Sequence, residues 1–421
     1  MGNYLNSGNE QFRKMAASEI YVDKTGLIEY TNRVINTMQS YLCVSRPRRF
    51  GKSMAAAMLV AYYSCGCSSE ALFQPYEISA SPDFHKHLNQ YDTIFLNVQE
   101  FLSRSSNGME MIARIKRMIL RELIEKYPDA DYFDRTDLTE SLKDIYTAYH
   151  RPFVFIIDEW DCIFREYKQD KEAQERYLDF LRDLLKDKVY VALAYMTGIL
   201  PIKKSGTHSA LNMFDEFSML DPGPLAQYTG FTEAEVRKLC EKYRMDLDEV
   251  KGWYDGYSFE REPSVYSPRS VVSCMRFGKL ENYWNQTETF EALQVYIDMN
   301  FDGLRDDILN MIAGNHVPVN TGSFTNDMTT FHSEDDVLTL LIHLGYLGYD
   351  SVSRCVFIPN YEVQSEYVNA VAVSDWGEVS FALKNSAETL KAIWEGRPAQ
   401  VAEGVRHTSY RTGHITFTLC T

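Results

Sequence analysis

Residues 40–53 read SYLCVSRPRRFGKS, and residues 54–64 continue as MAAAMLVAYYS. The first run begins apolar and β-rich, whereas the second stretch is a strong helix former. Residues 46–53 therefore join a predicted strand to a predicted helix. Phosphate-binding loops occur in this position, where backbone N–H groups and a helix N-terminus face the phosphates. Gly51, Lys52 and Ser53 occupy the last three positions of that loop's pattern.

The opening of this loop departs from the usual pattern. The pattern asks for a glycine five residues before Gly51, and the chain has Arg46 there. Pro47 fixes one φ angle and removes one N–H donor. The loop therefore need not have the standard shape, and an arginine side chain could replace a backbone donor. Arg46, Arg48 and Arg49 could neutralise triphosphate charge, contact an acidic partner or pair with surface carboxylates.

The composition is that of a globular chain with two or three domains. The chain has 421 residues, of which 45% are hydrophobic and 24% are charged. Its net charge of −16 argues against nucleic acid as a main partner, because proteins that neutralise phosphates usually carry a basic surplus. The sequence has neither an apolar run of about 18 residues nor a signal segment. The eight scattered cysteines fit reduced thiols, so we expect a cytoplasmic protein with no membrane contact.

Three further apolar runs read as buried strands: YDTIFLNVQ at 91–99, RPFVFIIDEWD at 151–161 and VYVALAYMTG at 189–198. Helical patterns at 108–127 and 171–187 separate these runs along the chain. Short, fully apolar strands that alternate with helices indicate a parallel sheet with both faces covered. The sequence therefore predicts an α/β fold of the P-loop NTPase kind, a parallel sheet with helices on both faces.

Near the middle of the chain the pattern changes from alternating strands and helices to mostly helices, so we divide the chain into three parts. Residues 1–225 form the P-loop domain, and residues 226–360 form a mostly helical region that begins with a capping box at Thr232 and Glu235. Within that region SEDDVLTLLIHLGYL reads as a second capped helix, and the segments YLGYD and CVFIPN read as a β-hairpin. This order suggests a winged-helix-like module. Residues 361–421 read as a helical linker and a tail.

An acidic pair follows a buried strand in FVFIIDEWD, where Asp158 and Glu159 come directly after five apolar residues. A nucleotide hydrolase needs one carboxylate at such a strand end to hold Mg²⁺, and often a second to activate water. We therefore expect Asp158 and Ser53 to hold the metal and Glu159 to act as the base. The alternative is a capped helix start with either acid facing solvent. Thr197, at the end of the next strand, either contacts the γ-phosphate or the attacking water, or is an ordinary strand-end threonine.

Seven motifs together look like those of the predicted AAA-ATPase-like proteins of anaerobic and gut bacteria. The resemblance covers about residues 10–400 and implies a P-loop NTPase domain followed by helical and winged-helix-like parts. Members of that family write the loop as RPRRFGK followed by Ser or Thr, so Arg46 resembles a family trait. In chain order the motifs are YVDKTGLI (21–28), SRPRRFGKS (45–53), FIIDEWD (155–161), MTGILPIKK (196–204), LNMFDEFSML (211–220), WYDGYSF (253–259) and VYSPRSVV (265–272).

The resemblance implies ATP and Mg²⁺ as ligands. It implies that Lys52, Ser53 and Asp158 hold the phosphates and the metal and that Glu159 is the base. In our main hypothesis Thr197 senses the γ-phosphate. The residues expected to contact the nucleotide are Arg48, Arg49, Phe50, Gly51, Lys52, Ser53 and Met54.

Other parts of the resemblance carry no assigned chemistry. Asp23, Lys24 and Thr25 lie near the expected nucleotide site without a defined role, and residues 253–257 read as a packed turn between helices. Related proteins usually continue into a nuclease-like domain of the PD-(D/E)xK type. The sequence after residue 400 has no such set of residues, so we assign no nuclease activity and expect a truncated or foreign tail.

The sequence supports one main function hypothesis and two alternatives. The main hypothesis is an Mg²⁺-dependent ATPase that moves the helical region against the sheet, with a transition-state arginine supplied by a protein partner or by self-association. The first alternative is a nucleotide-gated switch with little turnover, which Arg46 in place of glycine favours. The second is DNA engagement through residues 333–360, although that segment starts acidic and has few basic residues, such as Arg354.

Overall fold

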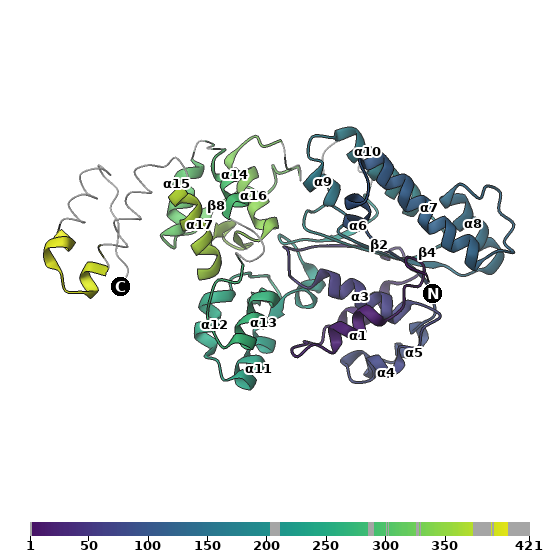
Figure 1. Cartoon of the computed structure of the whole chain (residues 1–421), viewed down its shortest axis with the longest axis horizontal. Helices are drawn as coiled ribbons and strands as arrows, with labels where there is room; N and C mark the ends of the chain where they lie inside the picture. Colours follow the sequence, from purple (N-terminus) through teal and green to yellow (C-terminus); the bar gives the residue numbers. More distant parts are fainter. Residues whose placement is uncertain are drawn as a thin grey trace.

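The computed structural model has an α/β part and a mostly helical part, which lie side by side along the long axis of the molecule (Figure 1). The expected C-terminal tail and part of the expected linker lie outside the described residues. Within the described ranges no helix is both long and apolar enough to cross a membrane. The structure describes residues 2–202, 211–284, 290–299, 301, 303–325, 328, 330–373, 389 and 391–402.

A five-stranded parallel sheet with the strand order β2-β3-β4-β1-β5 forms the centre of the α/β part. The four predicted strands are all present, and the predicted parallel sheet is confirmed. The sequence does not predict β5, because its three residues, Asp-Glu-Phe, are too few and too acidic to read as a strand. The strands are β1 Tyr41–Ser45, β2 Asp92–Asn97, β3 Phe153–Asp158, β4 Val191–Gly198 and β5 Asp215–Phe217.

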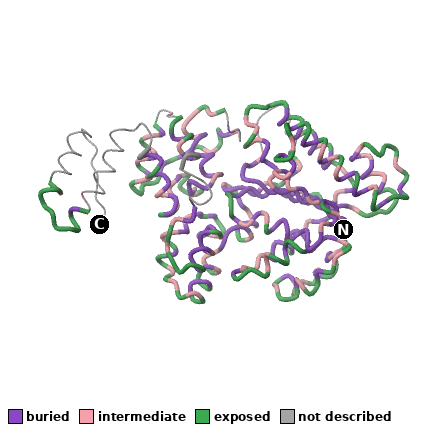
Figure 2. The backbone as a smooth tube through the Cα atoms, in the orientation of Figure 1, coloured by how far each residue is buried: buried purple, intermediate pink, exposed green. Residues whose placement is uncertain are grey.

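Helices cover both faces of this sheet, and the sheet forms a band of buried residues through the molecule (Figure 2). Along β3, Phe155 and Ile157 pack on one face, whereas Val154 and Ile156 pack on the other. One face carries α6 Val98–Ser103, α7 Gly108–Lys126, α8 Leu138–Tyr149, α9 Cys162–Glu166 and α10 Lys171–Leu185. The other carries α1 Glu10–Ala16, α2 Gly26–Val34, α3 Lys52–Tyr63, α4 Glu70–Phe73, the 3₁₀ turn η1 Glu77–Ala80 and α5 Phe84–His87.

Side-chain caps define where four of these helices begin. Asn97, Asn107, Asp137 and Asp170 each accept a hydrogen bond from the backbone N–H three residues further on, at the starts of α6, α7, α8 and α10. Such a cap stabilises a helix by about 1 kcal/mol. The helices predicted from periodicity correspond to α7 and α10 and end within two residues of the predicted limits.

The helical part begins with the predicted capping box, in which Thr232 and Glu235 bond each other's backbone N–H groups. The second predicted cap is wrong, because the Ser333 side chain makes no capping hydrogen bond; Asp336 instead accepts the N–H of His332. A short ladder of β6 and β7 escaped prediction, since each strand has two residues. The elements are η2 Gly223–Tyr228, β6 Phe231–Thr232, α11 Glu233–Tyr243, α12 Leu247–Tyr254, β7 Val265–Tyr266, α13 Pro268–Phe277, α14 Phe290–Ile297, α15 Leu304–Ile312, β8 Val317–Pro318, α16 Glu334–Leu344, β9 Gly348–Asp350, β10 Cys355–Phe357 and α17 Tyr361–Val373.

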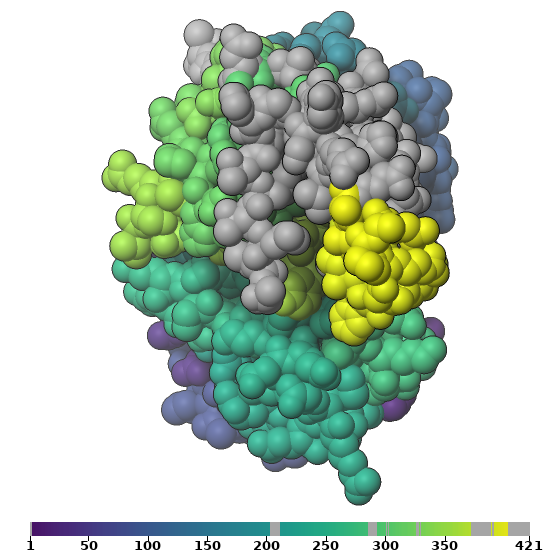
Figure 3. All heavy atoms as spheres, turned by 90° about the vertical axis from the view of Figure 1, so that its left-hand side faces the viewer, coloured from purple at the N-terminus to yellow at the C-terminus, as the bar shows by residue number. Residues whose placement is uncertain are grey.

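The predicted hairpin is present as the antiparallel pair β9 and β10, and β8 pairs with the other edge of β10. Helix α16 comes directly before this small sheet, and α17 comes directly after it. The assignment of this module as winged-helix-like stays a prediction. Figure 3 faces this end of the molecule, with described residues of the 391–402 segment at the front.

The two parts share buried cores. Phe50 and Leu200 of the α/β part pack in one apolar cluster with residues of α16 and α17, and Ile20 packs in another with residues of α11 and α13. A Cβ atom on Gly345, at the end of α16, would lie 2.7 Å from Pro47. The helical part therefore rests directly on the loop that follows β1.

Candidate functional site

The loop between β1 and α3 makes two sharp turns before the helix begins. Gly51 is the residue before α3 and has a φ angle of 86°, and Arg49 has a φ angle of 66°. A Cβ atom on Gly51 would meet nothing within 4 Å, so the glycine is required for its left-handed backbone and not for space. Turns of this kind next to a helix N-terminus form concave sites for anions.

Lys52 is the first residue of α3 and folds back across the loop. Its Nζ donates to the carbonyl oxygens of Arg46 at 2.9 Å and Pro47 at 2.8 Å. Burial lowers the pKa of Lys52, and the carboxylates of Glu159 and Asp158 oppose this shift. The ammonium group is thus buried within the loop, where a bound anion could replace the two carbonyl partners.

Arg46 lies under the loop and not on its open side. Its side chain is fully buried, and Nη1 donates to the carbonyl oxygens of Ser45 and Phe217, each at 2.8 Å. The guanidinium lies 5.3 Å from the ring centre of Phe259. Burial lowers its pKa to about 10. Arg46 therefore joins β1, β5 and the helical part, which explains an arginine where glycine is usual and removes this residue from the candidate phosphate donors.

Phe50 attaches the loop to the helical part. Its carbonyl oxygen accepts the N–H of Gly230 at 2.9 Å, and its ring packs edge-on against Tyr257, with centroids 5.1 Å apart. The Tyr257 hydroxyl donates to Gly345 O at 2.6 Å. A Cβ atom on Gly256 would lie 2.0 Å from the carbonyl oxygen of Pro359. The predicted packed turn between helices is wrong in part: the segment is packed, but Trp253 and Tyr254 end α12, and Tyr257 bridges to Val265 of β7.

The predicted carboxylates lie at the carboxyl end of β3. Asp158 is 1% exposed, and its Oδ1 accepts from the Thr197 hydroxyl and from Glu159 N, the latter at 3.1 Å. Glu159 has a φ angle of 56°, and its carboxylate accepts from Arg165. Burial raises the pKa of Glu159, and Lys52 and Arg165 oppose that shift. The fold thus brings together the acidic pair, Thr197 and Lys52, which are far apart in sequence.

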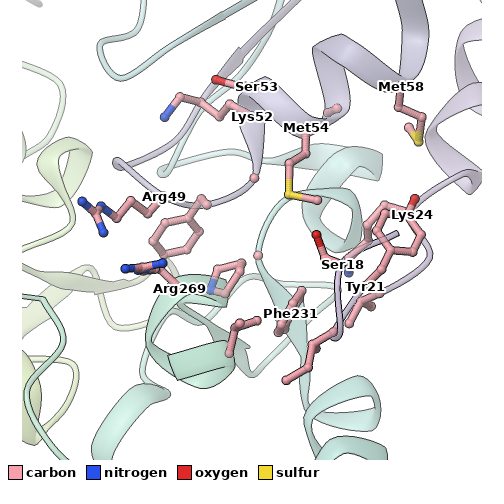
Figure 4. Close-up of a pocket in the computed structure, with 18 of the residues that line it drawn as sticks. Ser18, Tyr21, Lys24, Arg49, Lys52, Ser53, Met54, Met58, Phe231 and Arg269 are labelled. Atoms are coloured by element: carbon pink, nitrogen blue, oxygen red, sulfur yellow. The ribbon is translucent and has the colours of Figure 1, made fainter. Parts of the chain in front are cut away.

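A cavity of about 790 Å³ opens beside the loop. Its walls come from the N-terminal residues around Ile20, from the loop and the start of α3, and from the helical part. Lys52, Arg49 and Arg269 lie toward one end of the cavity (Figure 4). Arg49 and Arg269 also line a second, small hollow together, so the two guanidinium groups approach each other from different parts of the chain.

The opposite end of the cavity is mostly apolar. Met54 and Met58 of α3 face Tyr21 and Phe231 there (Figure 4). Tyr21 is partly buried, and burial raises its pKa well above the ordinary value. The cavity therefore combines a cationic end with an apolar, aromatic end, as a nucleotide pocket requires.

The predicted site residues divide into two groups by position. Asp158 and Thr197 are buried and do not line the cavity, whereas Glu159 does. All seven residues predicted to contact the nucleotide line it: Arg48, Arg49, Phe50, Gly51, Lys52, Ser53 and Met54.

Two arginines that line the cavity were not predicted from the sequence. Arg269 and Arg276 lie on α13, with Val272 between them on the same helix face. Arg276 also pairs with Glu19 at 3.2 Å. The motif VYSPRSVV contains the signal that could have found Arg269, because Pro268 marks a helix start and places the next residue in the first turn.

The Asp23-Lys24-Thr25 motif links the parts that form the cavity. Asp23 accepts the backbone N–H groups of Thr25 and Glu77, each at 2.8 Å. Lys24 forms an ion pair with Glu235 of the capping box at 2.6 Å. The motif therefore ties the N-terminal segment to the helical part.

A parallel sheet whose strand β1 enters a helix through such a loop, with an acidic pair at the end of β3, defines a P-loop NTPase fold. The comparison with protein families agrees: residues 6–208 match the model described as "Predicted AAA-ATPase", so this part of the chain is similar to that family. This match supports a P-loop domain of the nucleotide-binding kind.

A curated relative and two solved structures also match. An uncharacterized protein in the vnfD 5′ region of Azotobacter chroococcum mcd 1 is 25% identical over 291 residues, which are 67% of this chain and 54% of the relative. The chain thus spans about half the length of that relative. The Aeropyrum pernix ORC2 protein, solved in ADPNP-ADP complexes, is 12% identical, with a TM-score of 0.36 over 85% of this chain and 97% of its own. Caenorhabditis elegans PCH-2 is 13% identical, with a TM-score of 0.21 over 58% and 47%.

Proposed function

We propose that the chain binds ATP in the 790 Å³ cavity and hydrolyses it with the help of Mg²⁺, and that the nucleotide controls how the helical part sits on the sheet. The observation that carries the proposal is the cavity itself. It joins the N-terminal end of α3, with Lys52 and Ser53, to an apolar compartment of the size and character that a base needs.

The cationic end would hold the phosphates. Lys52 would exchange its two carbonyl partners in the loop for phosphate oxygens, and the first N–H groups of α3 would donate to the same group. Arg49 and Arg269 would add charge from the loop and from the helical part. The base would lie between Met54 and Phe231 at the apolar end.

Ser53 would hold Mg²⁺ from the cavity wall, and Asp158 would act through a water molecule, because its carboxylate does not line the cavity. Ser53 offers a hydroxyl and Asp158 a carboxylate, and hard oxygen ligands of this kind suit Mg²⁺, which usually keeps several waters and phosphate oxygens. Among the described residues, no cluster of three or more His, Cys, Asp or Glu side chains could hold a metal alone. When bound, the ion would neutralise charge on the terminal phosphates.

Glu159 would act as the base for hydrolysis. Its carboxylate lines the cavity next to Lys52, and the adjacent Asp158 is held by the Thr197 hydroxyl. Glu159 would take a proton from water while the water oxygen attacks the terminal phosphorus, and the bond to the ADP oxygen would break. Thr197 would act here through its contact with Asp158, at the carboxyl end of β4.

Binding would couple the two parts of the chain, because each contributes to the cavity wall. Arg269 and Phe231 come from the helical part, whereas Lys52 comes from the α/β part. Phe50 links the phosphate loop directly to Gly230. A nucleotide that contacts both sides would favour the arrangement in which they approach each other.

Lys52→Ala tests the binding step. The wild type should gain about 2.7 kcal/mol of stability at a Mg-ATP concentration near 100 times the dissociation constant, seen as a rise in unfolding temperature. Lys52→Ala should lose that rise, whereas Lys238→Ala, which removes an exposed lysine of α11 outside the cavity, should keep it. A full rise in Lys52→Ala would show that this cavity is not the ATP site.

A second candidate function, a nucleotide-gated switch with little turnover, is supported by the contact that Glu159 makes. Its carboxylate already accepts from Arg165, which weakens it as a base. Phosphate release by the wild type and by Glu159→Gln separates the two functions. ATP binding without turnover in the wild type would favour the switch and refute the hydrolysis.

A further inference from the structure

Arg165, on α9, bridges two carboxylates of the turn that follows β3. One amino group, Nη2, donates to Glu159, and Nε donates to Asp161 Oδ2 at 3.2 Å. Only 9% of the Arg165 side chain is exposed. A guanidinium can hold two partners in fixed directions because its donors lie in one rigid plane.

The Asp161 end of this bridge is firmly anchored. Asp161 is fully buried, and its Oδ2 also accepts the backbone N–H groups of Ile199 at 3.1 Å and Leu200 at 2.8 Å. These two residues directly follow β4. The position of Arg165 is therefore set by backbone groups next to the strand that carries Thr197.

The backbone around Glu159 is held equally closely. Glu159 has a φ angle of 56°, a backbone conformation that residues other than glycine rarely adopt. Such a conformation persists only where the surrounding structure enforces it. Trp160 N donates to Thr197 O at 3.0 Å, and a Cβ atom on Gly198 would lie 2.6 Å from Trp160 Nε1. The turn after β3 and the end of β4 thus form one packed unit, with Arg165 as its link to the Glu159 carboxylate.

We propose that Arg165 is a positioning residue for hydrolysis, which holds the Glu159 carboxylate in the direction that places one oxygen on the attacking water. This role rests on the proposed ATPase function. The contact uses Oε2, so Oε1 is the oxygen that would accept the water proton. Because Asp161 fixes the guanidinium, Arg165 orients the base before the nucleotide arrives, and it does not itself touch the substrate.

The opposite role, a restraint that keeps Glu159 away from the water, makes a different prediction. If Arg165 restrained the base, its removal would raise kcat. If Arg165 positions the base, its removal lowers kcat and leaves nucleotide binding unchanged, because the cavity lining does not include Arg165.

The variant must not leave Asp161 as a buried, unpaired charge. We therefore combine Arg165→Met with Asp161→Asn, which removes both charges of the inner pair and keeps an amide oxygen for the N–H groups of Ile199 and Leu200. Arg165→Lys alone keeps a cation beside Glu159. The measurements are phosphate release at saturating Mg-ATP and the dissociation constant of a non-hydrolysable ATP analogue.

The double variant should lose about 10- to 100-fold in kcat, the effect of one charge-assisted hydrogen bond, with a dissociation constant within about twofold of the wild type. Arg165→Lys should recover part of the rate. In a Glu159→Gln background the same double change should alter the residual rate by less than about twofold, since a positioning residue acts only through its partner.

The outcomes separate this inference from the function on which it rests. If the wild type binds ATP and releases no phosphate, the proposed hydrolysis and the role of Arg165 both fail. If the wild type hydrolyses ATP, two results overturn only the positioning role. The first is an unchanged or higher kcat in the double variant. The second is an equal additional loss of rate when the double change is made in the Glu159→Gln background.

Discussion

Glu362, on α17, is a buried carboxylate that joins α17 to α13, the helix that carries Arg269. Its Oε1 accepts the backbone N–H groups of Tyr283 at 2.6 Å and Trp284 at 3.0 Å, and its Oε2 accepts the Ser270 hydroxyl at 2.8 Å. Burial raises its pKa from the ordinary value of 4.5 to about 7, and these hydrogen bonds offset only part of that effect. The folded protein therefore binds a proton here at a pH where the unfolded chain has released it.

The size and sign of the effect follow from linkage. The interval from 4.5 to about 7 corresponds to about 3 kcal/mol, since each pH unit is worth about 1.4 kcal/mol. This stability is fully present below pH 4.5 and is lost as the pH rises to about 7. Glu362→Gln keeps the shape and an acceptor oxygen and removes the titration, so it should remove this part of the pH dependence.

Urea unfolding of the wild type and of Glu362→Gln at several pH values between 4.5 and 8 measures the effect. The stability of Glu362→Gln relative to the wild type should increase across this interval by about 3 kcal/mol. The neighbouring Glu366, whose pKa burial also raises, is the control: Glu366→Gln should leave the titration of Glu362 in place. A constant difference between Glu362→Gln and the wild type would refute the assigned protonation.

Two other substitutions test parts of the site. Arg46→Gly, which restores the usual loop residue, should lower the free energy of unfolding by several kcal/mol, because it leaves the buried carbonyls of Ser45 and Phe217 without their donor. The same variant should not bind ATP more tightly. A variant with wild-type stability and tighter ATP binding would contradict the structural role of Arg46. Arg269→Ala should weaken ATP binding about 10-fold and ADP binding less, since it removes a cation from the phosphate end. Titrations of both nucleotides measure this, with Arg237→Ala on the exposed side of α11 as the control; equal losses for ATP and ADP would place Arg269 away from the terminal phosphate.

Much of the α/β part can be predicted from local sequence. The strands β1 to β4 are continuous apolar runs that are buried on both faces. The local sequence therefore predicts each strand without information on the strands beside it. The order strand, loop, helix then places Lys52 at the edge of the sheet where Asp158 also lies. Periodicity identifies α7, and the capping box identifies the start of α11.

Features that depend on distant contacts could not be predicted. The strand β5 is short and acidic, and it exists because β1 offers it an edge. The role of Arg46 depends on Phe217 and Phe259, which the chain reaches only after folding. Pro268 marks the start of the helix that carries Arg269, but the approach of that helix to the phosphate loop depends on the folded chain.

The measurement that tests the central claim most directly is the dissociation constant of Mg-ATP, by calorimetric titration, for the wild type and for Lys52→Ala. The buried ammonium group at the start of α3 is the main cation of the proposed phosphate site. We predict measurable binding by the wild type and a loss of at least about 100-fold in Lys52→Ala, which corresponds to about 2.7 kcal/mol. Equal dissociation constants for the two proteins, or no binding by the wild type, would contradict the account.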